Sequence, residues 1–337
     1  MKQAYNLPAA AMLAAALVVF SSAAFAQSVL KFSHTDTAAG SRQQAAEFFA
    51  RKVEEYTQGR HKVQVFHSGQ LANDPKAVEQ LALGGIDFTV TGTGTYATHV
   101  KTLNLSALPY LVDTYEQGWK LYDDGKWMQA QFAQLPGKGM RILSTWEAGF
   151  RSFTTKEPLS GPADAKGKKM RIFPNDMIRW IMEGIGFSPV VMPVTEVYLA
   201  IQQGTVIGQE NPVDTIYSIR FYEVAPHITL TQHVYSPLPL SVSEARWRSF
   251  SDADKSAITK ASVEASALSR KLVRESEDAQ LKEMTAKGAK VSRPNVEPFR
   301  AAMKSVYDKA RGVYGNDMEV LLAEAEAIRK AIPAKMN

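Results

Sequence analysis

GKKMRIFPND, residues 167–176, has the alternation of a half-buried β-strand. Met170 and Ile172 point to one face of such a strand, and Arg171 points to the other. Pro174 then ends the strand, because proline has no N–H to donate to a neighbouring strand. The pattern therefore predicts a strand that carries an arginine to its end, where a loop begins.

Alternating strands and helices surround this stretch on both sides. Strands are predicted at 29–34, 61–66 and 86–91, with helices at 41–57 and from about 74 to 84 between them. The pattern restarts with strands at 140–145, 169–173 and 190–193 and helices at 176–184 and 195–203. A long helix is predicted over 252–287, followed by helices at 296–312 and 316–331. The first half of this order predicts a doubly wound parallel sheet and the second half a further α/β unit, and the long helix, at ~50 Å, could lie across both.

Length and composition also favour two domains in an exported protein. The chain has 337 residues, of which 45% are hydrophobic and 22% charged. Residues 1–26 combine a lysine, an apolar run and Ala24-Phe25-Ala26, which together predict a cleaved secretory signal peptide. The absence of cysteine suits a bacterial periplasm without disulfides. The net charge of +5 is scattered, so we predict no nucleic-acid partner.

The motifs that would indicate an enzyme are weak or absent. Residues 92–97 fit the dinucleotide fingerprint G-x-G-x-x-A, but they follow the third strand rather than the first and favour a small-residue lining of a cleft. The six histidines form no H-E-x-x-H pair, and no G-x-S-x-G elbow is present. We therefore predict no catalytic residues, no cofactor and no metal, with an exported α/β enzyme as a remote alternative.

Two arginines stand out as candidate ligand contacts. Arg151 follows the predicted strand 140–145, and Arg171 ends the predicted strand 169–173. If the two strands are parallel and consecutive, both guanidinium groups lie at the edge of the sheet where open α/β folds bind ligands. With Trp146 and Phe173 beside them, they would suit a carboxylate in a partly apolar cleft. Two surface arginines in ion pairs are the alternative, and spacing alone does not choose between the two.

Four stretches together resemble one family, the solute receptors of TRAP (tripartite ATP-independent periplasmic) transporters. They are EVYLAIQQGTVIGQENP at 196–212, GKKMRIFPN at 167–175, AGFRSFTT at 148–155 and GQLANDPKAVEQLALGGIDFT at 69–89. The resemblance covers nearly all of the chain after the signal peptide, with the motifs in family order.

This resemblance implies a two-lobed periplasmic binding protein fold that closes on a small organic acid. Each lobe is then a sheet flanked by helices, with the long helix spanning both. We expect lobe I to comprise 27–148 plus 237–276 and lobe II to comprise 149–236 plus 277–337, with the ligand cleft between them. The expected partners are a small carboxylate, a sugar acid or C4-type acid, and the membrane permease subunits of an ion-driven transporter. The protein itself is expected to be a monomer.

The resemblance also implies roles for individual residues. Arg171 would clamp the ligand carboxylate with two hydrogen bonds, Arg151 would make a second charge contact, and Asn211 would orient Arg171. Asn73 and Asp74 would contribute from the other lobe. The remaining residues that we expect at the ligand site are Trp146, Phe173, Asp214, Tyr235 and His34.

The ligand's identity stays open at this point. Sialic-acid-binding members carry an acidic residue where this chain has Gly92 and an aromatic residue where it has Val194, which argues against sialic acid. Trp146, Phe66, Phe173 and Tyr235 could stack on a ring, so an aromatic or keto acid is an alternative. A receptor for an ATP-driven importer is a more remote one.

Overall fold

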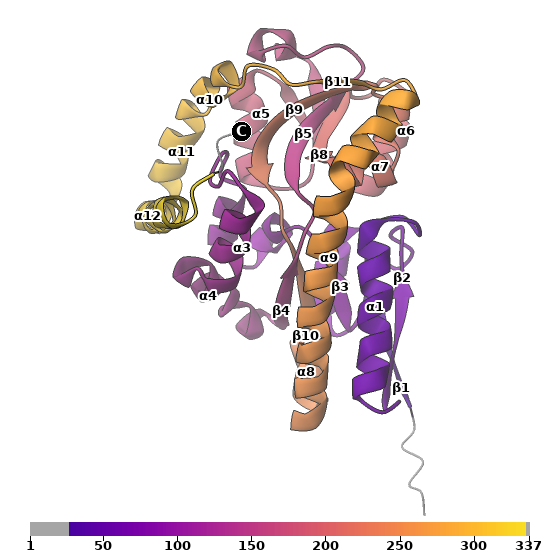
Figure 1. The fold of residues 1–337 in the computed structure, drawn as a ribbon. Helices are drawn as coiled ribbons and strands as arrows, with labels where there is room; N and C mark the ends of the chain where they lie inside the picture. Colours follow the sequence, from indigo (N-terminus) through magenta and orange to yellow (C-terminus); the bar gives the residue numbers. More distant parts are fainter. Residues whose placement is uncertain (1–26, 335–337) are drawn as a thin grey trace, which may run out of the picture.

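Two mixed sheets organise the chain (Figure 1). The computed structural model describes residues 27–334, so the predicted signal peptide lies outside the described residues. The first sheet has the strand order β2-β1-β3-β10-β4. Its strands are β1 (Ser28–Ser33), β2 (His61–Phe66), β3 (Phe88–Val90), β4 (Met140–Trp146) and β10 (Leu238–Ser243). β1 runs parallel to β2 and β3, as the sequence predicts, whereas β10 is antiparallel to both its neighbours.

The second sheet has the strand order β11-β9-β5-β8-β6-β7. Its strands are β5 (Phe150–Thr155), β6 (Lys169–Ile172), β7 (Ser188–Val191), β8 (Gly208–Pro212), β9 (His227–Tyr235) and β11 (Lys290–Ser292). The predicted strand that ends at Arg171 is confirmed as β6. The expectation that strands 140–145 and 169–173 are consecutive and parallel is wrong, because β4 belongs to the first sheet and β5 intervenes.

Two short crossovers and, later in the chain, one long helix carry the chain between the two sheets. β4 ends at Trp146 and β5 begins at Phe150, and the return runs from Tyr235 at the end of β9 to Leu238 in β10. Gly149 in the first crossover has φ of 105°, a conformation that favours glycine. The two crossovers are held together because the carboxylate of Glu147 accepts hydrogen bonds from the Gly149 N–H (2.7 Å) and the Tyr235 hydroxyl (2.6 Å).

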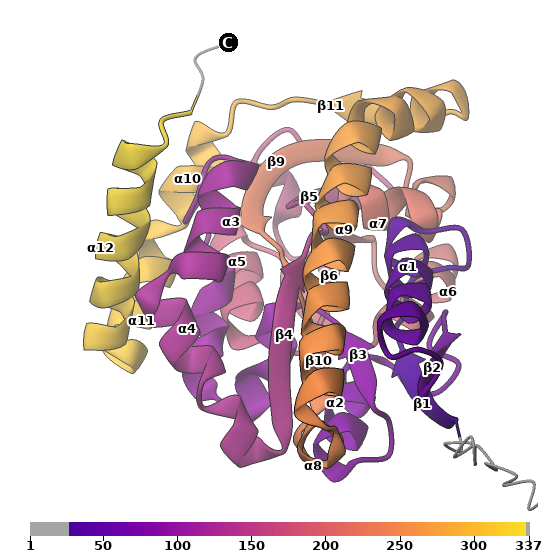
Figure 2. The same ribbon diagram turned by 60° about the horizontal axis from the view of Figure 1, so that its bottom comes forward.

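The predicted long helix is confirmed as α9 (Asp252–Ala286), and it runs beside both sheets (Figures 1 and 2). It packs against α1 (Ser41–Tyr56) and β4 near its start and against α7 (Val213–Ser218) further along. The side chain of Ser251 caps its first turn by accepting from the Asp254 N–H.

The other helices cover the faces of the sheets and the outer side of the molecule. They are α2 (Asp74–Leu83), α3 (Tyr115–Asp124), α4 (Lys126–Phe132), α5 (Asp176–Ile185), α6 (Val197–Gln202), α8 (Glu244–Ser249), α10 (Glu297–Ala302), α11 (Lys304–Tyr314) and α12 (Asn316–Ala331). Short 3₁₀ helices are η1 (Thr93–Thr98), η2 (Lys101–Ala107), η3 (Leu135–Lys138), η4 (Pro162–Ala165), η5 (Val194–Glu196) and η6 (Phe221–Glu223). The single helix predicted over 296–312 is therefore two, α10 and α11. None of the helices within 27–334 is long and apolar enough to span a lipid bilayer.

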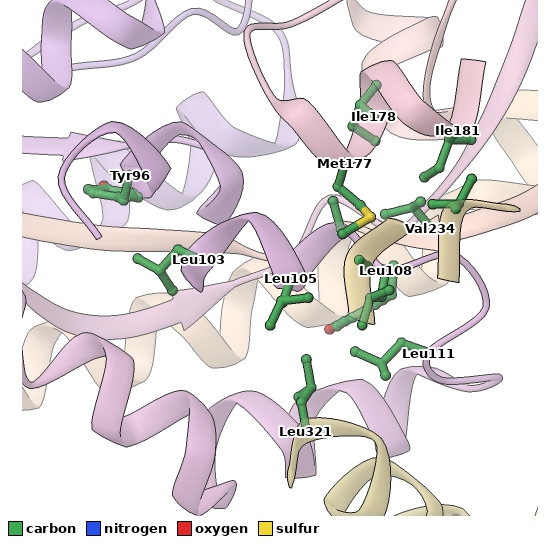
Figure 3. Packing of buried hydrophobic residues seen from close by; sticks show 14 of the residues in the cluster. Tyr96, Leu103, Leu105, Leu108, Leu111, Met177, Ile178, Ile181, Val234 and Leu321 are labelled. Carbon is green, nitrogen blue, oxygen red and sulfur yellow. The ribbon is translucent and has the colours of Figure 1, made fainter. Parts of the chain in front are cut away.

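The largest hydrophobic cluster joins elements that lie on either side of the first crossover. Figure 3 shows leucines of η2 and the segment after it close to Met177 and Ile178 of α5, with Leu321 of α12 in the same cluster. α12 itself packs against α3 and α4, which precede the first crossover. The C-terminal helices therefore connect the helical layers of both halves.

Candidate ligand-binding site

A cleft lies where the two sheets and both crossovers meet. It has about 880 Å³ of empty space, including the solvent at its mouth. Six of the residues predicted from the sequence line it: Asp74, Arg151, Arg171, Phe173, Asn211 and Tyr235. Gly92 and Val194 line it as well, so small side chains occupy the two positions that differ from the sialic-acid-binding pattern.

Arg171 is a buried cation at the end of β6, with 2% of its surface exposed. Its Nε and Nη2 donate to the carbonyl oxygen of Met192, at 3.0 and 2.9 Å. Burial lowers the pKa of Arg171 to about 10, a shift that Glu210 opposes, so the side chain stays protonated at neutral pH. Within residues 27–334 it has no carboxylate partner, and the outer end formed by Nη1 and Nη2 remains available.

Arg151 is buried too, but it is paired. Its Nε and Nη2 donate to the two carboxylate oxygens of Glu210, and its Nη1 donates to the Ser236 hydroxyl at 3.2 Å. Burial alone would raise the pKa of Glu210, but Arg151 and His233 lower it to about 2. The guanidinium also lies 5.1 Å from the centre of the Phe173 ring. The charge of Arg151 is therefore already neutralised inside the protein.

The strand topology explains why both arginines reach the same cleft. Arg151 was interpreted as a loop residue, but it lies near the start of β5, which is antiparallel to β8. β6 is parallel to β8, so the end of β6 and the start of β5 lie at the same edge of the second sheet. Two parallel strands are not needed to bring Arg171 and Arg151 together.

Asn211 lies at the end of β8, between these two strands. Its side-chain amide donates to the side-chain oxygen of Gln209, and Gln209 in turn donates to the Thr154 hydroxyl at 2.7 Å. Among the described residues, Asn211 makes no hydrogen bond to Arg171. Its carbonyl oxygen is the polar group that it can offer to the cleft.

Three residues of the cleft lining were not predicted from the sequence. Thr35, Asp36 and Arg42 lie between the end of β1 and the first turn of α1, and all three line the cleft. The Thr35 hydroxyl donates to Asp74 at 3.0 Å and accepts from Arg42 Nη1 at 3.3 Å. The signal was available, because these residues follow the carboxyl end of a parallel strand just as Arg171 does.

Three residues predicted for the ligand site lie elsewhere. Trp146 is 1% exposed in the core of the first sheet, with its ring centre 6.0 Å from that of Phe32. His34 is buried against the Gln43 side chain, and burial lowers its pKa to about 4. The side chain of Asn73 accepts from the Lys76 N–H and so caps α2.

Asp214, the fourth, lies outside the cleft and bridges the two halves of the protein. Its carboxylate accepts from the Ser41 hydroxyl at 2.6 Å, and Asp36 accepts from the Ser218 hydroxyl at 2.6 Å. Each half thus provides one aspartate and one serine, an arrangement that we call the double clasp (Ser41–Asp214 and Asp36–Ser218). Burial and the nearby charge of Asp36 raise the pKa of Asp214 to about 6.

Comparison with known proteins gives consistent matches in sequence and in fold. The family described as bacterial extracellular solute-binding protein, family 7, matches residues 32–312. The sialic acid-binding periplasmic protein of Vibrio cholerae serotype O1 is 32% identical over 264 residues, covering 78% of this chain and 82% of that protein. The sugar acid binding protein of Advenella mimigardefordensis, solved in complex with galactonate, is 28% identical with a TM-score of 0.87, covering 90% of this chain and 99% of that one. A TRAP periplasmic solute binding protein from Polaromonas sp. JS666, bound to D-erythronate, is 31% identical with a TM-score of 0.85, and the match covers 92% of this chain and 100% of that one.

Proposed function

The chain belongs to the bacterial extracellular solute-binding proteins of family 7, the solute receptors of TRAP transporters, and from this premise we propose that it captures a small organic acid in its cleft. The predicted family and the two-lobed α/β fold class are confirmed. The proposed ligand is a sugar acid or a C4-type acid, which the protein holds by closing its two halves. It then delivers the acid to an ion-driven membrane permease.

The observation that carries this proposal is the unpaired, buried charge of Arg171. A guanidinium with 2% of its surface exposed and no carboxylate partner among residues 27–334 is costly unless a ligand neutralises it. The Met192 carbonyl fixes the guanidinium plane, so its Nη1–Nη2 end is oriented before the ligand arrives. A carboxylate accepts from two such donors at once, which a neutral hydroxyl cannot match.

Contacts between the two halves support closure around the ligand. Besides the double clasp, the Asn175 side chain at the start of α5 donates to the Asn104 side chain at 2.9 Å. We infer that the two moving bodies are 27–148 plus 237–276 and 149–236 plus 277–337. The crossovers at 147–149 and 235–237 are then the hinge.

The setting in which the protein works follows from the same premise. We infer that residues 1–26 direct export and are removed, and that the mature protein acts in the periplasm. It works there as a monomer with the permease subunits of its transporter, and it catalyses no reaction.

A ligand screen with arginine variants tests the proposed function. Organic acids at about 100 times their Kd should stabilise the protein by ~2.7 kcal/mol in a thermal-shift assay, while neutral sugars should not. In calorimetric titrations, Arg171→Ala should weaken binding by at least ~30-fold, because an uncompensated charge contact costs ~2–5 kcal/mol. Arg171→Lys should recover little, since one ammonium cannot reproduce the planar two-point contact.

The exposed Arg179 on α5 provides a matched control, because Arg179→Ala removes the same charge outside the cleft. Its affinity should equal that of the unmodified protein. Affinity close to that of the unmodified protein in Arg171→Lys would show that Arg171 supplies only bulk charge, and the clamp would have to be abandoned.

A further inference from the structure

The wall of the cleft opposite Arg171 combines a cation with two carboxylates. Arg42 lies in the first turn of α1, and its backbone N–H donates to Asp36 at 3.2 Å. Asp74 begins α2, and Thr35 connects it to Arg42 through two hydrogen bonds. These hydrogen bonds form one continuous polar surface, which we call the lobe I wall (Thr35, Asp36, Arg42 and Asp74).

Arg42 has donors that the described part of the protein does not use. Its Nε is buried and has no hydrogen-bond partner within 27–334. Its Nη1 has only the long contact of 3.3 Å to Thr35, and no carboxylate forms an ion pair with it in the same range. A buried donor left without an acceptor costs free energy, so a ligand oxygen at this place would be stabilised.

Two carboxylates already surround Arg42 in the cleft lining, and none is bonded to Arg171. Arg151 is neutralised by Glu210, while the charge of Arg42 is flanked by those of Asp36 and Asp74. In the described lining of the cleft, the side chain of Arg171 makes no ion pair and hydrogen-bonds only to a carbonyl oxygen, whereas two carboxylates lie beside Arg42. A second carboxylate placed against the lobe I wall would meet Asp36 and Asp74, and like charges at such short range repel strongly in a site of low dielectric.

Resting on the proposed function, we propose that the lobe I wall recognises hydroxyl groups and that the ligand is a polyhydroxylated monocarboxylate. A hydroxyl group can donate to Asp74 and accept from Arg42 at the same time, whereas a carboxylate can only accept. The carboxylate of the ligand binds Arg171 in one half, and its hydroxyl groups bind the lobe I wall in the other. Dicarboxylates of the same length are rejected because their second carboxylate has no proton to donate to Asp74, and the two negative charges repel each other.

Two acids with the same carbon skeleton test this assignment. Galactonate and galactarate have the same hydroxyl groups on the carbons between their two ends, and they differ at one end, which is a hydroxymethyl group in galactonate and a second carboxylate in galactarate. In calorimetric titrations, galactonate should bind at least ~10-fold more tightly than galactarate, because one unfavourable charge contact of ~1.4 kcal/mol or more separates them. In Asp74→Asn the ratio of the affinity for galactonate to the affinity for galactarate should fall at least threefold. The variant should bind galactonate more weakly and galactarate more tightly than the unmodified protein does.

Two further variants complete the experiment. Arg42→Gln should weaken galactonate binding about tenfold, because the hydroxyl groups lose a charged donor. Asp278→Asn, on the exposed face of α9, removes a carboxylate far from the cleft lining and should leave both affinities unchanged. Urea unfolding of each variant shows whether it is folded before it is titrated.

The outcomes separate this inference from the proposed function. If acids bind through Arg171 but galactarate binds as tightly as galactonate, the lobe I wall does not reject a second charge and only this inference is overturned. An unchanged ratio in Asp74→Asn overturns it as well. If no acid binds, both the proposed function and the inference built on it are wrong.

Discussion

Substitution of one arginine of the cleft should reduce the stability of the protein, and substitution of the other should reduce its affinity for the ligand, although both were predicted from the sequence to contact the ligand. Arg151 and Glu210 form an ion pair in which 7% and 0% of the side-chain surfaces are exposed. Arg171 has only the Met192 carbonyl as a partner among the described residues. Arg151→Ala should therefore reduce stability, and Arg171→Ala should reduce affinity.

The expected magnitude follows from the buried pair. Removing Arg151 leaves the Glu210 carboxylate buried without its main counter-ion, which costs ~3–5 kcal/mol. A loss of 1 kcal/mol lowers the melting temperature of a somewhat smaller chain by ~2–4 °C, so a loss of ~3 kcal/mol or more should lower the melting temperature of Arg151→Ala by roughly 6 °C or more. Arg171→Ala removes hydrogen bonds to one carbonyl and relieves an unpaired buried charge, so its melting temperature without ligand should change by less than ~3 °C.

Urea unfolding with a double-mutant cycle measures the pair directly. Glu210→Gln should cost about as much as Arg151→Ala, because it leaves the opposite charge buried. Arg151→Ala combined with Glu210→Gln removes both charges of the pair, so the double variant should lose less stability than the sum of the two single losses. The coupling energy of the cycle reports the pair without reference to any ligand.

The pH dependence gives a second measurement of the same pair. The folded-state pKa of Glu210, about 2, lies below its ordinary value of 4.5. The pair's contribution to stability is therefore fully present above about pH 4.5 and is lost as pH falls toward 2. The stability difference between the unmodified protein and Glu210→Gln should shrink over this window. If Arg151→Ala unfolds at the same urea concentration as the unmodified protein yet loses affinity as strongly as Arg171→Ala, Arg151 is a ligand contact and this reasoning is refuted.

Three more predictions concern the hinge and the double clasp. Ser218→Ala removes the hydrogen bond to Asp36, and hydrogen bonds to charged groups are worth ~1.5–3 kcal/mol. The affinity for every acid that binds should therefore fall about tenfold or more, and the order of the acids by affinity should stay the same. A changed order in calorimetric titrations would place Ser218 at the ligand instead. Burial and the nearby charge of Asp36 raise the pKa of Asp214 from 3.8 to about 6, so this group's contribution to stability is fully present below about pH 3.8 and is lost as pH rises to about 6. Asp214→Asn should remove that part of the slope of melting temperature against pH, and an unchanged slope would contradict this assignment. Glu147→Gln replaces one acceptor oxygen by an amide donor that faces the donors of Gly149 and Tyr235. The free energy of unfolding, measured in urea, should fall by ~1–3 kcal/mol. An unchanged free energy of unfolding would mean that Glu147 is already protonated.

Local patterns predicted the elements whose two faces differ. β1, β2 and β6 alternate apolar and polar side chains, and α9 has both a capping serine and a long apolar periodicity. β5 was missed because all six of its residues are buried, so FRSFTT lacks the alternation of a half-exposed strand. Sequence patterns detect contrast between faces, and a strand buried on both sides offers none.

The same limit applied to the candidate site. Six residues predicted for it do line the cleft, and the resemblance to a family pointed to them. Trp146 and His34 were also predicted for the site, but Trp146 packs in the core of the first sheet and His34 is buried against Gln43. Position in the sequence indicates which end of a strand a residue occupies, but not which neighbours surround its side chain.

The sequence alone determined that a strand carries Arg171 to its end, that a 35-residue helix follows the second crossover and that the chain is a solute receptor. It could not determine that Arg151 is neutralised while Arg171 is not. That difference depends on Glu210, 59 residues away in the chain but adjacent in the neighbouring strand β8. Charge interactions and desolvation depend on distance and burial in space, and only the packed tertiary structure fixes either one.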